Sequence, residues 1–228
     1  MSTVRMPGEA TKLNEESERW LNAFRSPVLV AKRQRKHREK LKILRVPEWK
    51  RDAKVIDMCC GTGELLHILH ADGFKDLHGV DVTVDPNLVK EPWVSLTAAD
   101  CRALPYESNS FDSLLCMHAL HHMGGAQGVE AALKEAVRIL KPGGRLALID
   151  FYDSPWLRFT FWCFRQRWLT WVSPGIKNFG VLVEEEWSYL SRYLDQWNQT
   201  RPVIDKLPCE IEVKRQGLYF FYWVGIKK

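Results

Sequence analysis

Three acidic residues lie at or next to the ends of short apolar runs, in a pattern that could hold a ligand. These are Asp57, Asp81 and Asp100, and each run has the length of a buried strand. The first run leads into a glycine turn at residues 61–63, and an apolar, helix-like stretch follows it. A strand, a glycine turn and a helix start allow backbone N–H groups to approach a ligand. The sequence therefore predicts a site for a nucleotide-like ligand, the alternative being an ordinary strand-to-helix turn.

Histidines follow a later apolar run and could act as a general base. An imidazole changes its charge near neutral pH, so it can take a proton from a reacting group. His121 and His122 are the predicted catalytic residues, and the alternative for them is helix-start packing or hydrogen bonding to the backbone. His118 and His122 have the spacing of a helical metal pair, but they flank a strand end, and we predict no metal site.

Alternating apolar strands and helices indicate how these residues are positioned. Strands are predicted at residues 55–58, 77–82, 94–99, 113–117 and 146–151. Helices are predicted at residues 64–71 and 127–140, and the Lys-Pro-Gly-Gly sequence at 141–144 is expected to end the second helix. Strands separated by helices indicate a doubly wound, parallel α/β sheet that binds ligands beyond the carboxyl ends of its strands.

The last part of the chain breaks this alternation. Strand-like runs at residues 209–215 and 218–226 are separated by only two residues. So short a connection permits only an antiparallel hairpin. We therefore expect the sheet to finish with an antiparallel pair.

Two further segments are predicted around the sheet. Residues 1–50 form an N-terminal helical cap that is broken at Pro27, and residues 51–228 form the main domain. The main domain carries a helical, aromatic-rich insertion at residues 154–200, which includes a second amphipathic helix at 184–197. The aromatic-rich stretch at residues 154–172 of this insertion is too short and too charged to span a bilayer.

Aromatic side chains of the insertion are candidates for a substrate pocket. Trp156, Phe159 and Trp162 are predicted to line a site for an apolar substrate. The alternatives are packing against the core and a helix face that lies in a membrane interface.

Composition and charge narrow the class of protein. The chain has 228 residues with 46% hydrophobic and 27% charged residues, as in soluble globular proteins. Its start has no apolar core of the length that a secretory signal needs, so we expect a cytoplasmic protein. The six cysteines form no CxxC pair and are interpreted as reduced thiols.

A basic stretch at residues 32–42 contributes much of the net charge of +5. Its simplest interpretation is the solvated face of a helix, and the alternative is attraction to anionic lipid headgroups or RNA. No aromatic residues interleave with the charges, so nucleic acid is not an expected partner, whereas peripheral membrane contact stays open.

Four segments resemble, in the right order, the class I S-adenosylmethionine-dependent methyltransferases, most closely the UbiE/MenG group (methyltransferase type 11). They are CCGTGE at residues 59–64, ADCRALPYESNSFD at 99–112, RILKPGGRLALIDF at 138–151 and GLYFFYWVGIKK at 217–228. The resemblance implies a Rossmann-like, seven-stranded sheet with an antiparallel C-terminal hairpin. It also implies S-adenosyl-L-methionine as the cofactor and S-adenosyl-L-homocysteine as its product.

The resemblance assigns cofactor contacts one position at a time. Asp57 would hold the amino-acid end of the cofactor, Asp81 the ribose hydroxyls, and Asp100 with Cys101 the adenine. Cys59 replaces the usual first glycine of the motif. The implied cofactor contacts are Asp57, Cys59, Gly61, Thr62, Gly63, Asp81, Val82, Asp100, Cys101 and Met117, and His118 belongs to the substrate pocket.

Transfer of a methyl group to a small lipophilic acceptor is the activity that the resemblance implies. A quinol-like or phenolic carbon or oxygen is the leading interpretation, although His121 and His122 stand where quinone enzymes usually carry an Arg-Asn pair. An alternative acceptor is a phospholipid or another amine, whose methylation needs no strong base. An alternative of another class is a cofactor-binding but catalytically silent partner subunit. The sequence does not predict the oligomeric state.

Overall fold

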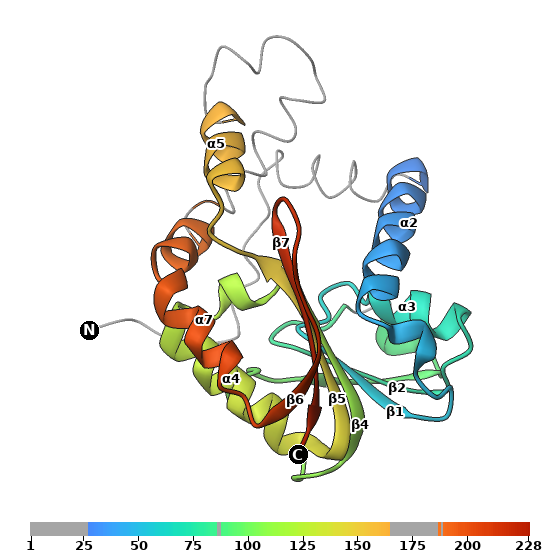
Figure 1. The fold of residues 1–228 in the computed structure, drawn as a ribbon. Helices are drawn as coiled ribbons and strands as arrows, with labels where there is room; N and C mark the ends of the chain where they lie inside the picture. Colours follow the sequence, from blue (N-terminus) through green and yellow to red (C-terminus); the bar gives the residue numbers. More distant parts are fainter. Residues whose placement is uncertain (1–26, 86–87, 165–186, 188) are drawn as a thin grey trace.

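The computed structural model describes residues 27–85, 88–164, 187 and 189–228 (Figure 1). The predicted cap is therefore described only from residue 27, and residues 165–186 and 188 of the predicted insertion lie outside the described part. The division of the chain into cap, main domain and insertion stays a prediction.

Seven strands form one mixed sheet in the order β3-β2-β1-β4-β5-β7-β6. They are β1 (Lys54–Met58), β2 (Asp76–Asp81), β3 (Val94–Ala98), β4 (Phe111–Met117), β5 (Leu140–Phe151), β6 (Cys209–Gln216) and β7 (Phe220–Lys227). The first five strands pair in parallel, whereas β7 is antiparallel to both β5 and β6. The predicted fold class and the C-terminal hairpin are thus confirmed.

Helices cover both faces of this sheet. They are α2 (Pro27–Ile43), α3 (Glu64–Ala71), α4 (Ala126–Ile139), α5 (Pro155–Phe164) and α7 (Trp197–Asp205). Figure 1 shows α2 and α3 on one face and α4 and α7 on the other. Each face has its own buried apolar cluster, one including Leu44 and Leu66 and the other including Leu133 and Trp197. Burial from both sides explains why the central strands are continuous apolar runs rather than alternating ones.

The two connections next to the edge strand β3 contain no α-helix in the described residues. In the described residues between β2 and β3 the only helix is a single 3-10 turn, η2 (Leu88–Lys90), and residues 99–110 between β3 and β4 contain no helix. Between the parallel strands the sequence predicted helices only at residues 64–71 and 127–140, and both are present as α3 and α4. Pro92 disfavours a helix in the connection between β2 and β3. In the connection between β3 and β4, side-chain hydrogen bonds hold the backbone in place of a helix.

Strand β5 begins six residues before its predicted start at residue 146, because Leu140 already pairs with Phe111. The pairing then shifts, so that Ser113 pairs with Arg145 and the Lys-Pro-Gly-Gly sequence becomes an irregularity in the strand. The preceding helix, α4, ends at Ile139, one residue before the end that the Lys-Pro-Gly-Gly sequence predicted. Near the other end of the chain, residues 189–195 are helical and α7 follows them. The predicted helix at 184–197 is therefore followed by further helical backbone up to Asp205.

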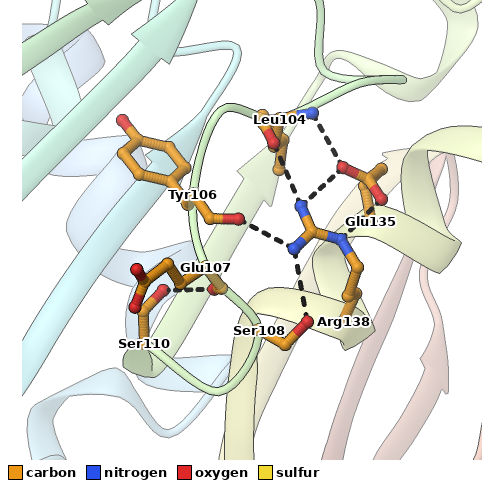
Figure 2. Close-up of polar contacts among 7 residues, drawn as sticks. All are labelled: Leu104, Tyr106, Glu107, Ser108, Ser110, Glu135 and Arg138. Atoms are coloured by element: carbon orange, nitrogen blue, oxygen red, sulfur yellow. Dashed lines mark hydrogen bonds and ion pairs between the residues drawn. The ribbon is translucent and has the colours of Figure 1, made fainter.

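One arginine of α4 holds the whole connection between β3 and β4 (Figure 2). The guanidinium of Arg138 donates to the carbonyl oxygens of Leu104 at 3.0 Å and Tyr106 at 2.7 Å. It also pairs with Glu135, whose carboxylate accepts the Leu104 N–H at 2.8 Å. The same connection carries Asp100 and Cys101 a few residues earlier, so Arg138 stabilises the segment that bears these two site residues without a helix there.

The basic stretch is not simply a solvated helix face. Arg33 of α2 pairs with Glu64 of α3 at 2.9 Å, and Arg38 pairs with Asp72. These contacts attach α2 to the helix that follows the glycine turn. Part of the positive charge therefore serves to position α2 beside the site.

Candidate active site

A pocket of about 510 Å³ opens at the carboxyl ends of the parallel strands. It is lined by Cys59, Gly61, Asp81, Val82, Asp100, Cys101, Arg102, His118, Ala119, His122, Met123 and Tyr189. Eight of these are site residues predicted from the sequence, brought together from the ends of β1, β2, β3 and β4. Arg102, Ala119, Met123 and Tyr189 were missed; the first three are neighbours of predicted residues, and Tyr189 lies in the predicted insertion.

The turn after β1 has a backbone that only a few residue types adopt easily. Cys59, Gly61 and Gly63 have positive φ angles of 63°, 49° and 71°. Cys59 is thus an L residue in the left-handed region, at the position where the resembling family has glycine. Its N–H donates to the carbonyl oxygen of Val80 at 2.7 Å, which ties the turn to β2.

Asp81 completes this connection between the first two strands. One oxygen of its carboxylate accepts the Gly61 N–H at 2.9 Å, and the other accepts the Thr83 N–H at 3.1 Å. A carboxylate has about four lone-pair positions, so each oxygen can still accept a further hydrogen bond from the pocket. Asp81 therefore both shapes the turn and presents acceptors to a ligand.

An added methyl group should have different main effects at the two glycines of the turn. At Gly61 it should mainly weaken ligand binding, and at Gly63 it should mainly lower stability. A Cβ at Gly61 would meet no protein atom within 4 Å, because it would point into open space, whereas a Cβ at Gly63 would lie 2.1 Å from Leu88 Cδ2. We expect Gly61→Ala to cost only about 1–2 kcal/mol of stability, from its positive φ, yet to weaken S-adenosylhomocysteine binding at least about tenfold. Gly63→Ala should lose about 1–3 kcal/mol more from overpacking. Urea denaturation and titration calorimetry measure the two effects, and equal destabilisation with unchanged binding would contradict this assignment.

Asp57 is buried and is not among the residues that line the pocket. Its side chain is 2% exposed, and burial, followed by the nearby Asp81 charge, raises its pKa to about 8. Thr62, Gly63 and Met117 also lie outside the residues that line the pocket. The assignment of these four residues to cofactor binding stays a prediction.

Asp100 is engaged by its neighbour Arg102. Its carboxylate accepts the Arg102 backbone N–H at 2.8 Å and a two-pronged contact from the guanidinium at 2.6–3.0 Å. The side-chain hydrogen bond from Arg102 lowers the pKa of Asp100. The pocket therefore has an ionised Asp100 with a cation beside it, a contact that the sequence analysis did not include.

The structure separates the two histidines that were predicted as bases. His121 is buried, and its Nδ1–H donates to Asp150 Oδ1 at 2.8 Å. The other oxygen of Asp150 accepts the Leu120 N–H at 2.6 Å, so this carboxylate holds the 3-10 turn η3 (Leu120–His122). His122 is exposed and lines the pocket, where its ring lies 5.3 Å from that of Tyr189.

His118 lines the pocket and is joined to a lysine from the basic stretch. Its Nε2 lies 2.6 Å from Lys40 Nζ, and the Lys40 ammonium lies 4.5 Å from the centre of the Phe220 ring. Burial, and then the charge of Lys36, lower the pKa of Lys40 to about 8. Burial and Lys40 in turn lower the pKa of His118 to about 3, so this imidazole is neutral at neutral pH. No local sequence signal distinguished Lys40 from the other cations of α2.

The part of the chain that carries these residues is similar to known proteins. A family model described as "Methyltransferase domain" matches residues 56–148, which span the glycine turn, the three acids and the histidines. Residues 56–148 thus resemble methyltransferase domains. The "2-phytyl-1,4-naphtoquinone methyltransferase" of Nostoc punctiforme is 30% identical over 158 residues, which cover 62% of this chain and 64% of that relative. The "Ubiquinone/menaquinone biosynthesis C-methyltransferase UbiE" of Campylobacter jejuni is 28% identical over 177 residues, 74% of this chain and 71% of its own.

Solved methyltransferase structures share the fold. Magnesium protoporphyrin IX methyltransferase (ChlM) from Synechocystis, solved with bound SAH, superposes with a TM-score of 0.59 at 14% identity. That similarity covers 95% of this chain and 96% of ChlM. The PH0226 protein of Pyrococcus horikoshii gives the same TM-score at 22% identity, over 85% of this chain and 91% of that one. At such identities the likeness establishes the class I methyltransferase fold.

Helix α5 has one buried face and one exposed face. Leu157 and Phe161 are buried in the main apolar cluster. Trp156, Phe159 and Trp162 are 59%, 54% and 58% exposed and are not among the residues that line the pocket. Their assignment to a substrate pocket stays a prediction, and within the described residues they form an exposed aromatic stripe.

Proposed function

We propose that this chain is an S-adenosylmethionine-dependent methyltransferase that acts on a small, lipophilic, quinol-like acceptor. The observation that carries the proposal is the convergence of Gly61, Asp81 and Asp100 on one pocket at the carboxyl ends of β1, β2 and β3. In a doubly wound sheet this is the place where adenosine-containing ligands bind.

The residues present fit the cofactor. Asp81 retains acceptor positions for a ribose diol after its two backbone hydrogen bonds. Val82, 71% exposed, offers an apolar surface to an adenine ring, and Gly61 leaves open space where a side chain would stand. The carboxylates of Asp81 and Asp100 suit a ligand that carries a sulfonium and an ammonium. When bound, S-adenosylmethionine supplies an electrophilic methyl group, and the protein has to hold an acceptor in line with it in a dry pocket.

The proposed class of acceptor rests on the names of the relatives and on three other residues that line the pocket. Relatives of this chain are named for phytylnaphthoquinone, demethylmenaquinone and ubiquinone or menaquinone. His122, Met123 and Tyr189 give the pocket an apolar and aromatic side with one exposed imidazole. These groups suit a quinol ring, whose hydroxyl proton has to leave as its carbon or oxygen is methylated.

The aromatic stripe of α5 supports delivery of such an acceptor from a bilayer surface. No helix in the described part of the chain is long and apolar enough to cross a membrane. Exposed Trp156, Phe159 and Trp162 instead suit a helix that lies in the interface between headgroups and acyl chains. The acceptor should therefore be tested in phospholipid vesicles rather than in free solution.

His122 is the proposed base of the reaction, and its replacement separates the acceptor classes. We expect His122→Asn to lower labelled-methyl transfer to vesicle-bound demethylmenaquinol by about 100-fold or more, because the hydroxyl proton loses its acceptor. S-adenosylhomocysteine binding should be unchanged. His78→Asn is the matched control, since His78 pairs with Asp76 on β2 away from the pocket. Transfer to phosphatidylethanolamine that survives His122→Asn would instead favour amine methylation.

Titration calorimetry followed by the methyl-transfer assay tests the proposed function as a whole. We expect the purified chain to bind S-adenosylmethionine and S-adenosylhomocysteine and to methylate the quinol. Binding without transfer to any lipid-extract acceptor would identify a silent cofactor-binding subunit. Absence of binding would overturn the proposal.

A further inference from the structure

Two thiols from separate elements meet at the wall of the pocket. Cys59 Sγ lies 2.8 Å from Cys101 Sγ, and the two residues are 42 positions apart in the sequence. Both residues line the cofactor pocket. As a thiol pair they form one hydrogen bond, with either sulfur as the donor.

Backbone contacts on both sides hold the two sulfurs together. The left-handed turn at Cys59 is fixed by its N–H bond to Val80 O at 2.7 Å. Cys101 follows β3 in a turn held by the hydrogen bonds from Ala99 N to Asp81 O and from Ala103 N to Asp100 O, both 2.9 Å long. These contacts hold the two turns that carry the thiols side by side.

We propose that Cys59 and Cys101 form a disulfide when a peroxide enters the pocket, and that this bond and the cofactor exclude each other. A disulfide has a sulfur–sulfur distance of about 2.05 Å, so the two atoms must approach by only about 0.8 Å. The inference rests on the proposed function for the identity of the ligand, whereas the cross-link itself does not depend on it.

The oxidation balances with hydrogen peroxide as the oxidant. The Cys101 sulfur attacks one peroxide oxygen and the O–O bond breaks, which gives a sulfenic acid and one water. The Cys59 sulfur then attacks the Cys101 sulfur and displaces the hydroxyl as a second water, so both thiol protons end in water. The hydrogen bond with Cys101, and burial, raise the pKa of Cys59, so we expect the cross-link to form slowly at neutral pH.

The other described cysteines near the pocket are less well placed for this reaction. Cys60 is buried in the apolar cluster on the opposite face of the sheet, and Cys116 is fully buried inside the strand layer. Neither lines the pocket. A peroxide that enters the cofactor site therefore meets Cys59 and Cys101 first.

Cofactor binding and disulfide formation should be thermodynamically linked. A ligand in the pocket covers both thiols, and a bond between them draws the turn after β1 towards the turn after β3. If the disulfide lowers the affinity for the ligand, the bound ligand must disfavour disulfide formation by the same factor. We expect oxidation to lower the affinity for S-adenosylhomocysteine by about tenfold or more, within the usual range of such coupling.

Mass spectrometry and calorimetry on the full chain test this inference. The reduced protein is treated with hydrogen peroxide, alkylated with iodoacetamide and digested. We expect a peptide pair linked through residues 59 and 101, formed more slowly when S-adenosylhomocysteine is bound. Affinity for S-adenosylhomocysteine should fall on oxidation and return with dithiothreitol.

Two variants sharpen the result. Cys59→Gly keeps the left-handed turn, because glycine adopts positive φ without strain, and its S-adenosylhomocysteine affinity should no longer respond to peroxide. Cys209→Ser removes a buried thiol of β6 outside the pocket lining and should leave the cross-link intact. Peroxide treatment without a 59–101 cross-link, or a cross-link that leaves the affinity unchanged, overturns the inference. A cross-link in a protein that never binds the cofactor would overturn the exclusion and the proposed function, while the pairing of the thiols would stand.

Discussion

Replacing Asp81 with alanine should reduce the affinity for S-adenosylhomocysteine by about 100-fold, which corresponds to roughly 3 kcal/mol. The variant loses a carboxylate that would accept hydrogen bonds from the two ribose hydroxyls. It also releases the Gly61 N–H, which Asp81 holds at 2.9 Å, so the turn loses one of its hydrogen bonds to β2. Titration calorimetry with S-adenosylhomocysteine measures the loss directly.

Asp76→Ala provides the matched control for this experiment. Asp76 is an exposed acid at the opposite end of the same strand, and it pairs with His78 rather than facing the pocket. We expect its affinity to equal that of the wild type. Asp81→Asn should fall between the two, since an amide keeps one acceptor oxygen. An Asp81→Ala protein that is folded and binds with wild-type affinity would place the cofactor elsewhere.

Asp150→Ala should destabilise the protein by about 3–5 kcal/mol, because it leaves polar groups without their partner in the interior. Asp150 is fully buried at the end of β5, where it accepts hydrogen bonds from His121 Nδ1 and from the N–H of Leu120. Urea denaturation at pH 7 measures the loss. The same Asp76→Ala variant serves as the control, since it removes an Asp–His pair of equal length, 2.8 Å, from an exposed position. That change should stay within about 1 kcal/mol.

The effect of Asp150 should also depend on pH. Burial alone would raise its pKa, but the charge and the hydrogen bond of His121 outweigh burial and lower it. A carboxyl with a lowered pKa in the folded state stabilises the protein above its unfolded pKa of about 3.9 and loses this contribution as the pH falls. The difference between wild type and Asp150→Ala should therefore be complete at pH 7 and shrink below about pH 4. A difference that grows on acidification would contradict the assignment.

The sequence predicted the elements whose signal is local. Apolar runs and the glycine turn located β1, β2 and β4, and the two-residue gap before residue 218 correctly required a hairpin. The acids at the strand ends came together because the carboxyl ends of parallel strands share one edge. That step follows from fold class alone, so Asp81 and Asp100 needed no knowledge of side-chain contacts.

The features that the sequence did not predict depend on contacts between distant segments. Lys40 was one cation in a basic stretch, and only the packing of α2 brings it 2.6 Å from His118. Asp150 lay inside an apolar run and was taken as part of a strand, although it holds His121. The early start of β5 follows from the pairing of Leu140 with Phe111, which no local propensity encodes. Likewise, the helix-free connection after β3 depends on Arg138, which lies about thirty residues further along the chain.

The place of β7 in the sheet has a consequence for protein synthesis. Residues 220–227 fill the gap between β5 and β6, so the sheet cannot close while they are still inside the ribosome. Until then the nascent chain shows the unpaired backbone of β5 to its surroundings, and such an edge can recruit a strand from another chain. Helices α3 and α4 can pack during translation, but the final sheet forms only after release of these residues. Chaperones that shield strand edges should therefore act on this chain until residues 220–227 have emerged.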